Sequence, residues 1–118
     1  MSIQRFHVGP RMSDMAVHNG TVYLAGQVAD DTAQDISGQT AQVLATIDKL
    51  LAEAGTDKTK ILSTTIYITD MANFPAMNAV WDAWVVAGNT PPRATVEAKL
   101  ARPAYKVEIQ VIAAKPLS

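Results

Sequence analysis

The sequence contains no cysteine and only two histidines. Without thiols the chain has no disulfide, no thiolate ligand for zinc and no cysteine nucleophile. Two imidazoles also supply few ligands for a catalytic metal site, which is usually built from three protein side chains. No glycine-rich phosphate loop of the GxGxxG or GxxxxGK type occurs either. We therefore expect neither a metal nor an organic cofactor.

Charged residues are also scarce. Lys, Arg, Asp and Glu make up 18% of the chain, which is below the usual quarter. Ten basic residues against eleven acidic ones give a net charge of −1 at pH 7, whereas nucleic-acid-binding proteins normally carry a basic surplus. The longest apolar runs, such as 84–87 and 111–114, are far shorter than the roughly 20 residues that span a bilayer. We expect a cytoplasmic protein that binds neither nucleic acid nor membrane.

The apolar content is ordinary, at 48% of 118 residues. This length predicts one domain over residues 1–118, because a second hydrophobic core would not fit. A small domain with few charges either exposes apolar surface or covers it with a partner.

Hydrophobic spacing predicts an α+β fold. Asn19-Gly20 between two β-prone segments is typical of a type I′ hairpin turn. Gly26 then interrupts a strand pattern, and such a glycine often marks a bulge or a close backbone approach. The order β-β-α-β-α-β-β predicts one mixed sheet with both helices packed on one face. The expected elements are strands within 16–25, a helix ending before Gly55, a strand at 61–69, a helix ending before Gly88, and strands at 94–100 and 105–113.

Capping residues predict the helix ends. Asp35 or Ser37 can cap the first helix, and Gly55 is a natural residue just after its end. Asn73 is expected to cap the second helix, with Pro75 tolerated in its first turn. The apolar face of the second helix is predicted to consist of Phe74, Met77, Trp81, Trp84 and Val85, which favours a core role over a cofactor site.

Arg93 and Glu108 are the candidates for binding and catalysis. Arg93 follows Pro91-Pro92 and opens a strand, where its guanidinium can point into a cleft and bind a carboxylate. The alternative is a surface arginine on a loop. Glu108 lies within the last strand and can position or deprotonate a water, although alternation alone favours a solvated outward residue.

Other polar residues carry weaker signals. His7 and His18 are possible bases, but neither has a recognisable partner nearby in the sequence. Glu97 is interpreted as a structural or surface residue. Asn78 lies on or beside the apolar face of the second helix, where a half-buried amide needs hydrogen-bond partners.

Several segments together resemble the RidA/YjgF family. The most specific is PPRATVE (91–97) followed by VEIQ (107–110), which is similar to the family's C-terminal signature. Gly9-Pro10, the segment LAGQV (24–28) and the segment DMANFPAMN (70–78) match further family landmarks. The match runs in order over nearly the whole chain.

The resemblance implies a chorismate-mutase-like fold and a homotrimer with three ligand clefts between neighbouring subunits. Family members hydrolyse reactive enamines and imines to 2-oxo acids and ammonia. Arg93 corresponds to the residue that binds the substrate carboxylate, and Glu108 to the one thought to orient the attacking water. The positions that match the substrate-binding lining of the cleft are Thr95, Gly26, Phe74 and Asn78.

The chain departs from the family pattern near its start, and Ala94 and Thr95 stand at two positions after Arg93 that also vary. Archetypal members have a tyrosine after Gly-Pro, whereas Arg11 follows here, which predicts a divergent subgroup. The alternative hypothesis is therefore a non-catalytic trimer that binds or senses 2-oxo acids or similar small carboxylates through Arg93. An RNA-acting or chaperone-like role, claimed for some relatives, finds no basic patch to support it.

Overall fold

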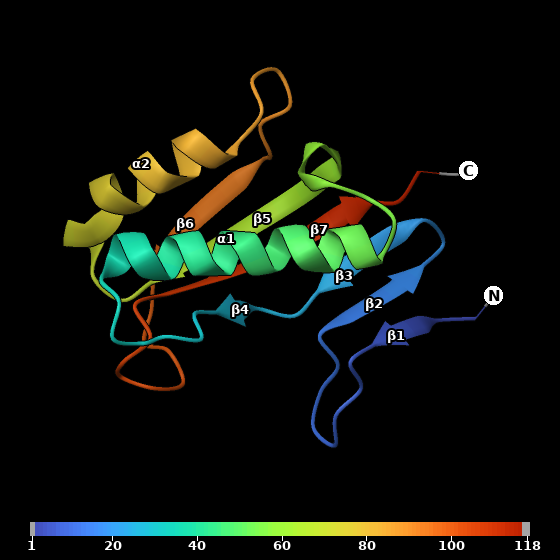
Figure 1. Cartoon of the computed structure of the whole chain (residues 1–118), viewed down its shortest axis with the longest axis horizontal. Coiled ribbons are helices and arrows are strands. Elements are labelled where there is room, and N and C mark those ends of the chain that lie inside the picture. The colour runs from blue at the N-terminus through green and yellow to red at the C-terminus, as the bar shows by residue number, and fades with distance from the viewer. Residues whose placement is uncertain (1, 117–118) are drawn as a thin grey trace.

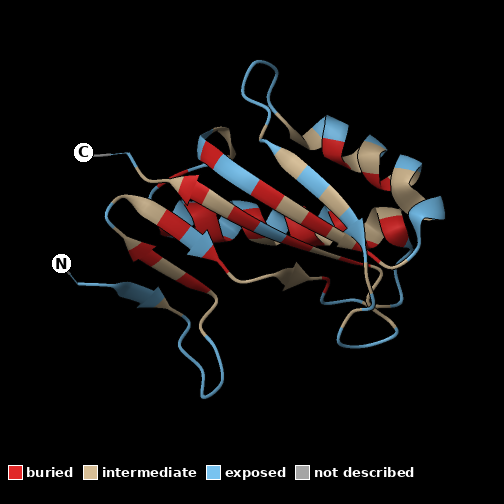
Figure 2. Ribbon diagram, turned by 180° about the vertical axis from the view of Figure 1, so that it is seen from behind, coloured by how far each residue is buried: buried red, intermediate tan, exposed pale blue. Residues whose placement is uncertain are grey.

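The computed structural model describes residues 2–116. One seven-stranded mixed sheet runs in the order β1-β2-β3-β7-β5-β6, and β4 also pairs with β7. Both helices cover the same face of this sheet (Figure 1), and the opposite face carries no helix (Figure 2). The predicted α+β architecture is therefore confirmed. No helix in residues 2–116 combines the length and apolarity that crossing a bilayer requires.

Four short strands precede the first helix, one strand lies between the two helices, and two strands follow the second helix. The strands are β1 (Gln4–Phe6), β2 (Met15–His18), β3 (Thr21–Leu24), β4 (Gln27–Val28), β5 (Ile61–Ile68), β6 (Arg93–Glu97) and β7 (Val107–Ala114). The helices are α1 (Ile36–Glu53) and α2 (Phe74–Trp84), with short 3₁₀ turns at Lys58–Lys60 and Met71–Asn73. Strands β1 and β4 were not predicted, because each is too short to show an alternating pattern.

The hairpin turn between β2 and β3 is confirmed. Asn19 and Gly20 have φ values of 52° and 77°, as both central residues of a type I′ turn require. His18 pairs with Thr21 across the turn. The Gly20 carbonyl accepts a hydrogen bond from the Lys115 N–H at 2.8 Å, which ties the hairpin to the C-terminal end of β7.

The interruption at Gly26 is also confirmed. Strands β3 and β4 pair with the same strand, β7, on either side of it. Tyr23 pairs with Ile112 and Gln27 pairs with Ile109, so the 23–27 segment holds one residue more than the segment of β7 that it faces. An extra residue of this kind is the signature of a bulge. It re-aims the backbone at Gly26 toward β7.

Helix α1 is capped by Asp35, which decides between the two predicted caps. The Asp35 carboxylate accepts a hydrogen bond from the Gly38 N–H at 2.8 Å. The helix ends at Glu53, and its C-cap Ala54 is followed by Gly55 at φ 84°. Its apolar stripe packs on the sheet. The most buried apolar members of that stripe are Val43, Leu44, Ile47, Leu50 and Leu51.

Helix α2 begins differently from the prediction. Asn73 makes no capping hydrogen bond through its side chain, because its backbone is already helical (φ −86°, ψ −1°), whereas a capping residue is normally extended. Asp70 instead accepts a hydrogen bond from the Ala72 N–H at 2.9 Å and starts a 3₁₀ turn that leads into α2. The helix ends at Trp84, whose carbonyl accepts a 2.5 Å hydrogen bond from Lys58 Nζ.

The sixth and seventh strands are also shorter at one end than predicted. Strand β6 stops at Glu97 instead of continuing to Leu100, because its partner β5 ends at Ile68 and offers no further pairing. The last strand begins at Val107, so Tyr105 lies outside it. Residues 98–106 form the connecting loop, and this loop borders the site described below.

Gln39 is a fully buried polar residue of α1 that joins three segments. Its Nε2 donates to the carbonyls of Ala104 (3.1 Å), Gln34 (3.1 Å) and Thr32 (3.3 Å). Its Oε1 accepts from the Lys106 N–H at 2.9 Å. One side chain therefore satisfies backbone groups both before α1 and in the loop that leads into β7. The sequence pattern gave no sign of this role.

We predict that Gln39→Met destabilises the protein by about 2–4 kcal/mol, because several buried backbone groups lose their partners and each costs about 1–3 kcal/mol. Urea unfolding measures the loss. Gln42→Met is the control, since Gln42 accepts one exposed hydrogen bond from the Asp31 N–H and should cost about 1 kcal/mol or less. Equal losses in the two variants would contradict this account.

Candidate functional site

Arg93 lies at the start of β6 and faces helix α2. Its Nη2 donates to Asn78 Oδ1 at 2.8 Å. Its Cζ lies 5.2 Å from the ring centroid of Trp81 and 5.7 Å from that of Phe74. Aromatic faces at these distances stabilise a cation through their ring quadrupoles. Three side chains spaced along α2 thus hold the guanidinium, as expected for residues separated by three and four positions.

Among residues 2–116 the guanidinium has no partner of opposite charge. Its Nη1 is buried and makes no hydrogen bond, and the same holds for the hydroxyls of Thr95 and Thr64. Thr64 pairs with Arg93 and Ile66 pairs with Thr95 across β5 and β6, so all three unpartnered groups lie on one face of the sheet. The ion pair recorded within residues 2–116 joins His7 and Glu53, far along the chain from Arg93. A half-buried cation with a spare donor edge is suited to binding a carboxylate.

Glu108 lies on β7, on the opposite face of the sheet. It pairs with Tyr67 of β5, and Tyr67 in turn pairs with Val96 of β6. Because successive residues of a strand point to opposite faces, Glu108, Tyr67 and Val96 point away from the helices, whereas Thr95 and Arg93 point toward them. One copy of the chain therefore does not bring Arg93 and Glu108 together.

Gly26 lets the Glu108 carboxylate lie against the backbone. A Cβ built on Gly26 would lie 2.1 Å from Glu108 Oε2 and 2.8 Å from its Cδ. A side chain at this position would therefore collide with the carboxylate. The close backbone approach expected of Gly26 is thus an approach to Glu108.

A cavity of about 400 Å³ opens on this helix-free face. Its volume is suited to a small metabolite. Both predicted residues of this region, Gly26 and Glu108, line it. The remaining lining residues are Tyr67, Ala98, Lys99, Leu100, Ala101 and Gln110.

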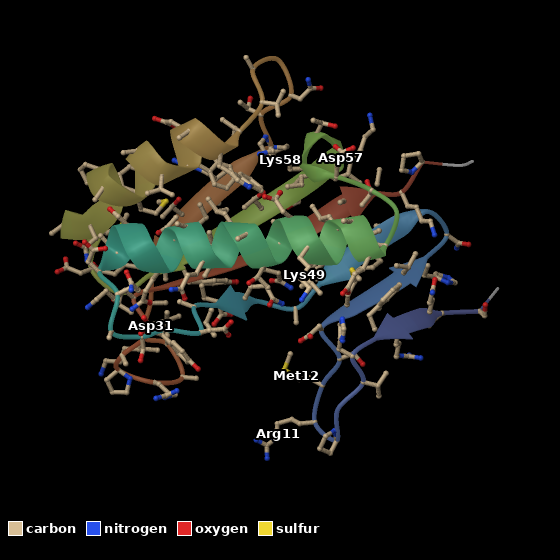
Figure 3. The ribbon with its side chains drawn as sticks, in the orientation of Figure 1. Arg11, Met12, Asp31, Lys49, Asp57 and Lys58 are labelled. Atoms are coloured by element: carbon tan, nitrogen blue, oxygen red, sulfur yellow. The ribbon has the colours of Figure 1, made fainter. Side chains whose placement is uncertain are left out.

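The other sequence candidates lie outside these two regions. His7 Nε2 lies 2.8 Å from Glu53 Oε2, and His18 Nδ1 lies 3.4 Å from the Ser2 carbonyl. Glu97 accepts a hydrogen bond from the Met71 N–H at 3.0 Å, in agreement with a structural role. Arg11 lies at the outer end of the loop between β1 and β2 and points away from the sheet (Figure 3).

Three residues near the candidate site were not identified from the sequence. Trp81 was assigned to the core, and it is buried, but its ring also lies over the Arg93 guanidinium. Tyr67 and Lys99 line the cavity beside Glu108. Alternation along 61–69 could have placed Tyr67 opposite the helices. Lys99 was expected within the strand at 94–100 and lies instead in the loop after β6. Within residues 2–116, no group of three or more His, Asp or Glu side chains is arranged to hold a metal ion.

Comparisons with known proteins agree with this fold over its whole length. The family model described as Endoribonuclease L-PSP matches residues 3–115. A RutC family protein of Haemophilus ducreyi is 50% identical over 112 residues, which cover 95% of this chain and 96% of the relative. The RutC family protein YoaB of Escherichia coli is 47% identical over 114 residues, which cover 97% and 99%.

Solved structures of related proteins have the same fold. A YjgF family protein from Neisseria meningitidis superposes with a TM-score of 0.97 at 47% identity, covering 100% of this chain and 98% of that one. A member of the Rid family, YyfA from Yersinia pestis, gives a TM-score of 0.82 at 38% identity, covering 91% and 89%.

The chain belongs to the YjgF/Rid family. The predicted membership is thereby confirmed, and the fold is consistent with the chorismate-mutase-like architecture that the resemblance implied. The roles of the individual site residues, from Arg93 to Glu108, stay predictions, and the measurements below address them.

We predict that Arg93→Met either raises the free energy of unfolding or lowers it by no more than about 1 kcal/mol. The reason is that it replaces a cation lacking a counter-ion with an apolar chain. Asn78→Leu should instead cost about 1.5–3 kcal/mol, since it removes a hydrogen bond to a charged group and leaves that group buried. Urea unfolding compares the two. A loss at Arg93→Met as large as at Asn78→Leu would show that the arginine is mainly structural.

We further predict that Gly26→Ala displaces the Glu108 carboxylate at little cost, about 1 kcal/mol, because the colliding atoms end a flexible side chain. In a Glu108→Ala background, Gly26→Ala should be neutral or stabilising. The Glu108 carboxylate no longer occupies the space beside residue 26, and alanine restricts the unfolded chain more than glycine does. The coupling between the two substitutions in urea unfolding measures the contact. Strict additivity would contradict it.

Proposed function

We propose that the protein hydrolyses reactive 2-imino and enamine acids to 2-oxo acids and ammonia, in clefts between the subunits of a homotrimer. The observation that carries this proposal is the Arg93 guanidinium, which is held by Asn78 and two aromatic rings and keeps a buried Nη1 without a partner. A carboxylate accepts two parallel hydrogen bonds from such a group. The substrate class follows from this chemistry and from the family.

The reaction needs little beyond binding and a placed water. The carbon of a protonated imine, C=NH₂⁺, is already electrophilic, so no metal or nucleophilic side chain is required. Arg93 holds the α-carboxylate while Glu108 accepts a proton from a water whose oxygen attacks that carbon. The resulting carbinolamine takes this proton on its nitrogen, the C–N bond breaks and ammonia leaves. The hydroxyl oxygen becomes the carbonyl of the 2-oxo acid, and its proton leaves as the C=O bond forms.

The two faces of the sheet support a cleft between copies. Arg93 faces α2 and Glu108 faces away from it, so a substrate that meets both must lie between one copy's Arg93 and another's Glu108. Apolar side chains on the helix-free face are available to contact a second copy. Tyr23 and Val96, both on that face, are 47% and 41% exposed. Burial of such groups favours association.

A small carboxylate is favoured over RNA, although the matched family model carries the description of an endoribonuclease. The net charge is −1, whereas RNA binding relies on a basic surface. The second candidate function is binding of 2-oxo acids without turnover. The exposed position of Arg11, where archetypal relatives have a cleft tyrosine, favours it.

The deciding experiment generates 2-imino acids from several amino acids with an amino-acid oxidase and follows the loss of trappable imine. Wild type should accelerate this loss. Arg93→Met and Glu108→Gln should each lower kcat/KM by about 10²–10⁴-fold, the range for losing an oriented binding group or a proton acceptor. Saturable binding of 2-oxo acids with no acceleration for any imine would favour the binding-only function instead.

The subunit arrangement predicts complementation. When Arg93→Met and Glu108→Gln chains are unfolded and refolded together, mixed trimers contain sites with Arg93 from one chain and Glu108 from its neighbour. Activity should return in the mixture to about a quarter of the wild-type value, since random assembly leaves both groups intact at one interface in four. Each variant refolded alone is the control and stays inactive. A mixture as inactive as its parents would place both residues in one chain's site.

A further inference from the structure

A lysine side chain lines the cavity that contains Glu108. Lys99 is the one Lys or Arg side chain among the residues that line the cavity of about 400 Å³, together with Gly26, Tyr67 and Glu108. It is exposed. Within residues 2–116 no carboxylate lies at ion-pair distance from its ammonium group. The cavity therefore contains a cation that is not neutralised by a close partner.

Positive charge continues into the neighbouring cavity. This second cavity, of about 340 Å³, is lined by Lys99 and Arg102 and by the apolar groups of Leu100 and Pro103. The Arg102 guanidinium contacts Tyr105, since its Nη1 lies 3.5 Å from the Tyr105 hydroxyl and its Cζ lies 5.2 Å from the Tyr105 ring centroid. Lys99 lines both cavities, so it connects this second cavity with the one that contains Glu108.

The backbone around Lys99 is held in place on both sides. The Ala98 N–H donates to the Ile68 carbonyl at 3.0 Å, immediately before Lys99. The far end of the loop is held by Gln39 through Ala104 and Lys106. A loop anchored at both ends presents its side chains with little ordering cost on binding.

We propose that Lys99 makes the site selective for imino acids whose side chain ends in a carboxylate. This inference rests on the proposed function and names its substrate class. Lys99 and Glu108 line the same cavity, so a substrate whose imine carbon meets Glu108 there lies beside an ammonium group. An ammonium group there attracts a second carboxylate and gives no advantage to a neutral side chain.

The test compares two imines of nearly equal shape. An oxidase converts aspartate to an imine with a distal carboxylate and asparagine to the matching amide, and the loss of each imine is followed with wild type, Lys99→Met and Lys99→Glu. We expect wild type to prefer the aspartate imine. Lys99→Met should lower kcat/KM for it about tenfold and leave the asparagine imine within twofold, and Lys99→Glu should lower it further. Lys49→Met, on the exposed side of α1 (Figure 3), is the control and should change neither.

The outcomes separate this inference from the proposed function. If Lys99→Met slows both imines equally or neither, the selectivity role is wrong while the hydrolase function stands. If wild type hydrolyses no imine, the hydrolase function is wrong, and calorimetry with 2-oxoglutarate and 2-oxopentanoate tests Lys99 directly. A loss of affinity confined to 2-oxoglutarate in Lys99→Met would then support selectivity for the second carboxylate. Equal affinities of wild type and Lys99→Met for 2-oxoglutarate would overturn it.

Discussion

The alternation of side chains across one sheet is the constraint on which the site depends. Strand β5 lies between β6 and β7, so its register assigns the faces of both neighbours. Thr64 and Ile66 face the helices and set Arg93 and Thr95 on that side, whereas Tyr67 sets Glu108 on the other. A slip of one residue in either pairing would exchange the faces. The buried, β-branched centre of β5 therefore fixes Arg93 beneath α2 and Glu108 in the open cavity.

Arg93 and Glu108 have different surroundings on the two faces of the sheet. On the helical side, Arg93 is held by side chains of α2 through one hydrogen bond and two ring contacts. On the open side, the Glu108 carboxylate lies against the backbone at Gly26, where any side chain would collide with it. Gln39 connects the two, because it extends from the helical layer to the loop that leads into β7.

Features set by local sequence were predictable, whereas those set by distant contacts were not. The hairpin at Asn19-Gly20 and the start of α1 at Asp35 follow from turn and capping chemistry within a few residues. The start of α2 was misassigned, because the Asp70 turn absorbs the role expected of Asn73. Gln39 was missed because its partners lie up to 67 residues away.

In the site, Arg93 and Asn78 were both identified as candidates from the sequence. Their hydrogen bond forms because β6 pairs with β5 and thereby lies beside α2. The face that each strand residue presents follows from register, which a single sequence does not reveal.

The environment of Arg93 is informative because it is unfavourable for the stability of the folded chain. A guanidinium is costly to place among apolar groups unless it is fully paired, yet here one of its nitrogens is buried without a partner. The hydroxyls of Thr64 and Thr95 on the same face add two more unpartnered groups. Aromatic rings offset part of this cost through their quadrupoles without consuming the hydrogen-bond donors. A carboxylate partner from the protein would have stabilised the fold more, but it would also have occupied the donors that an acidic ligand needs. The arrangement is therefore what selection for anion binding would retain and what selection for stability alone would remove.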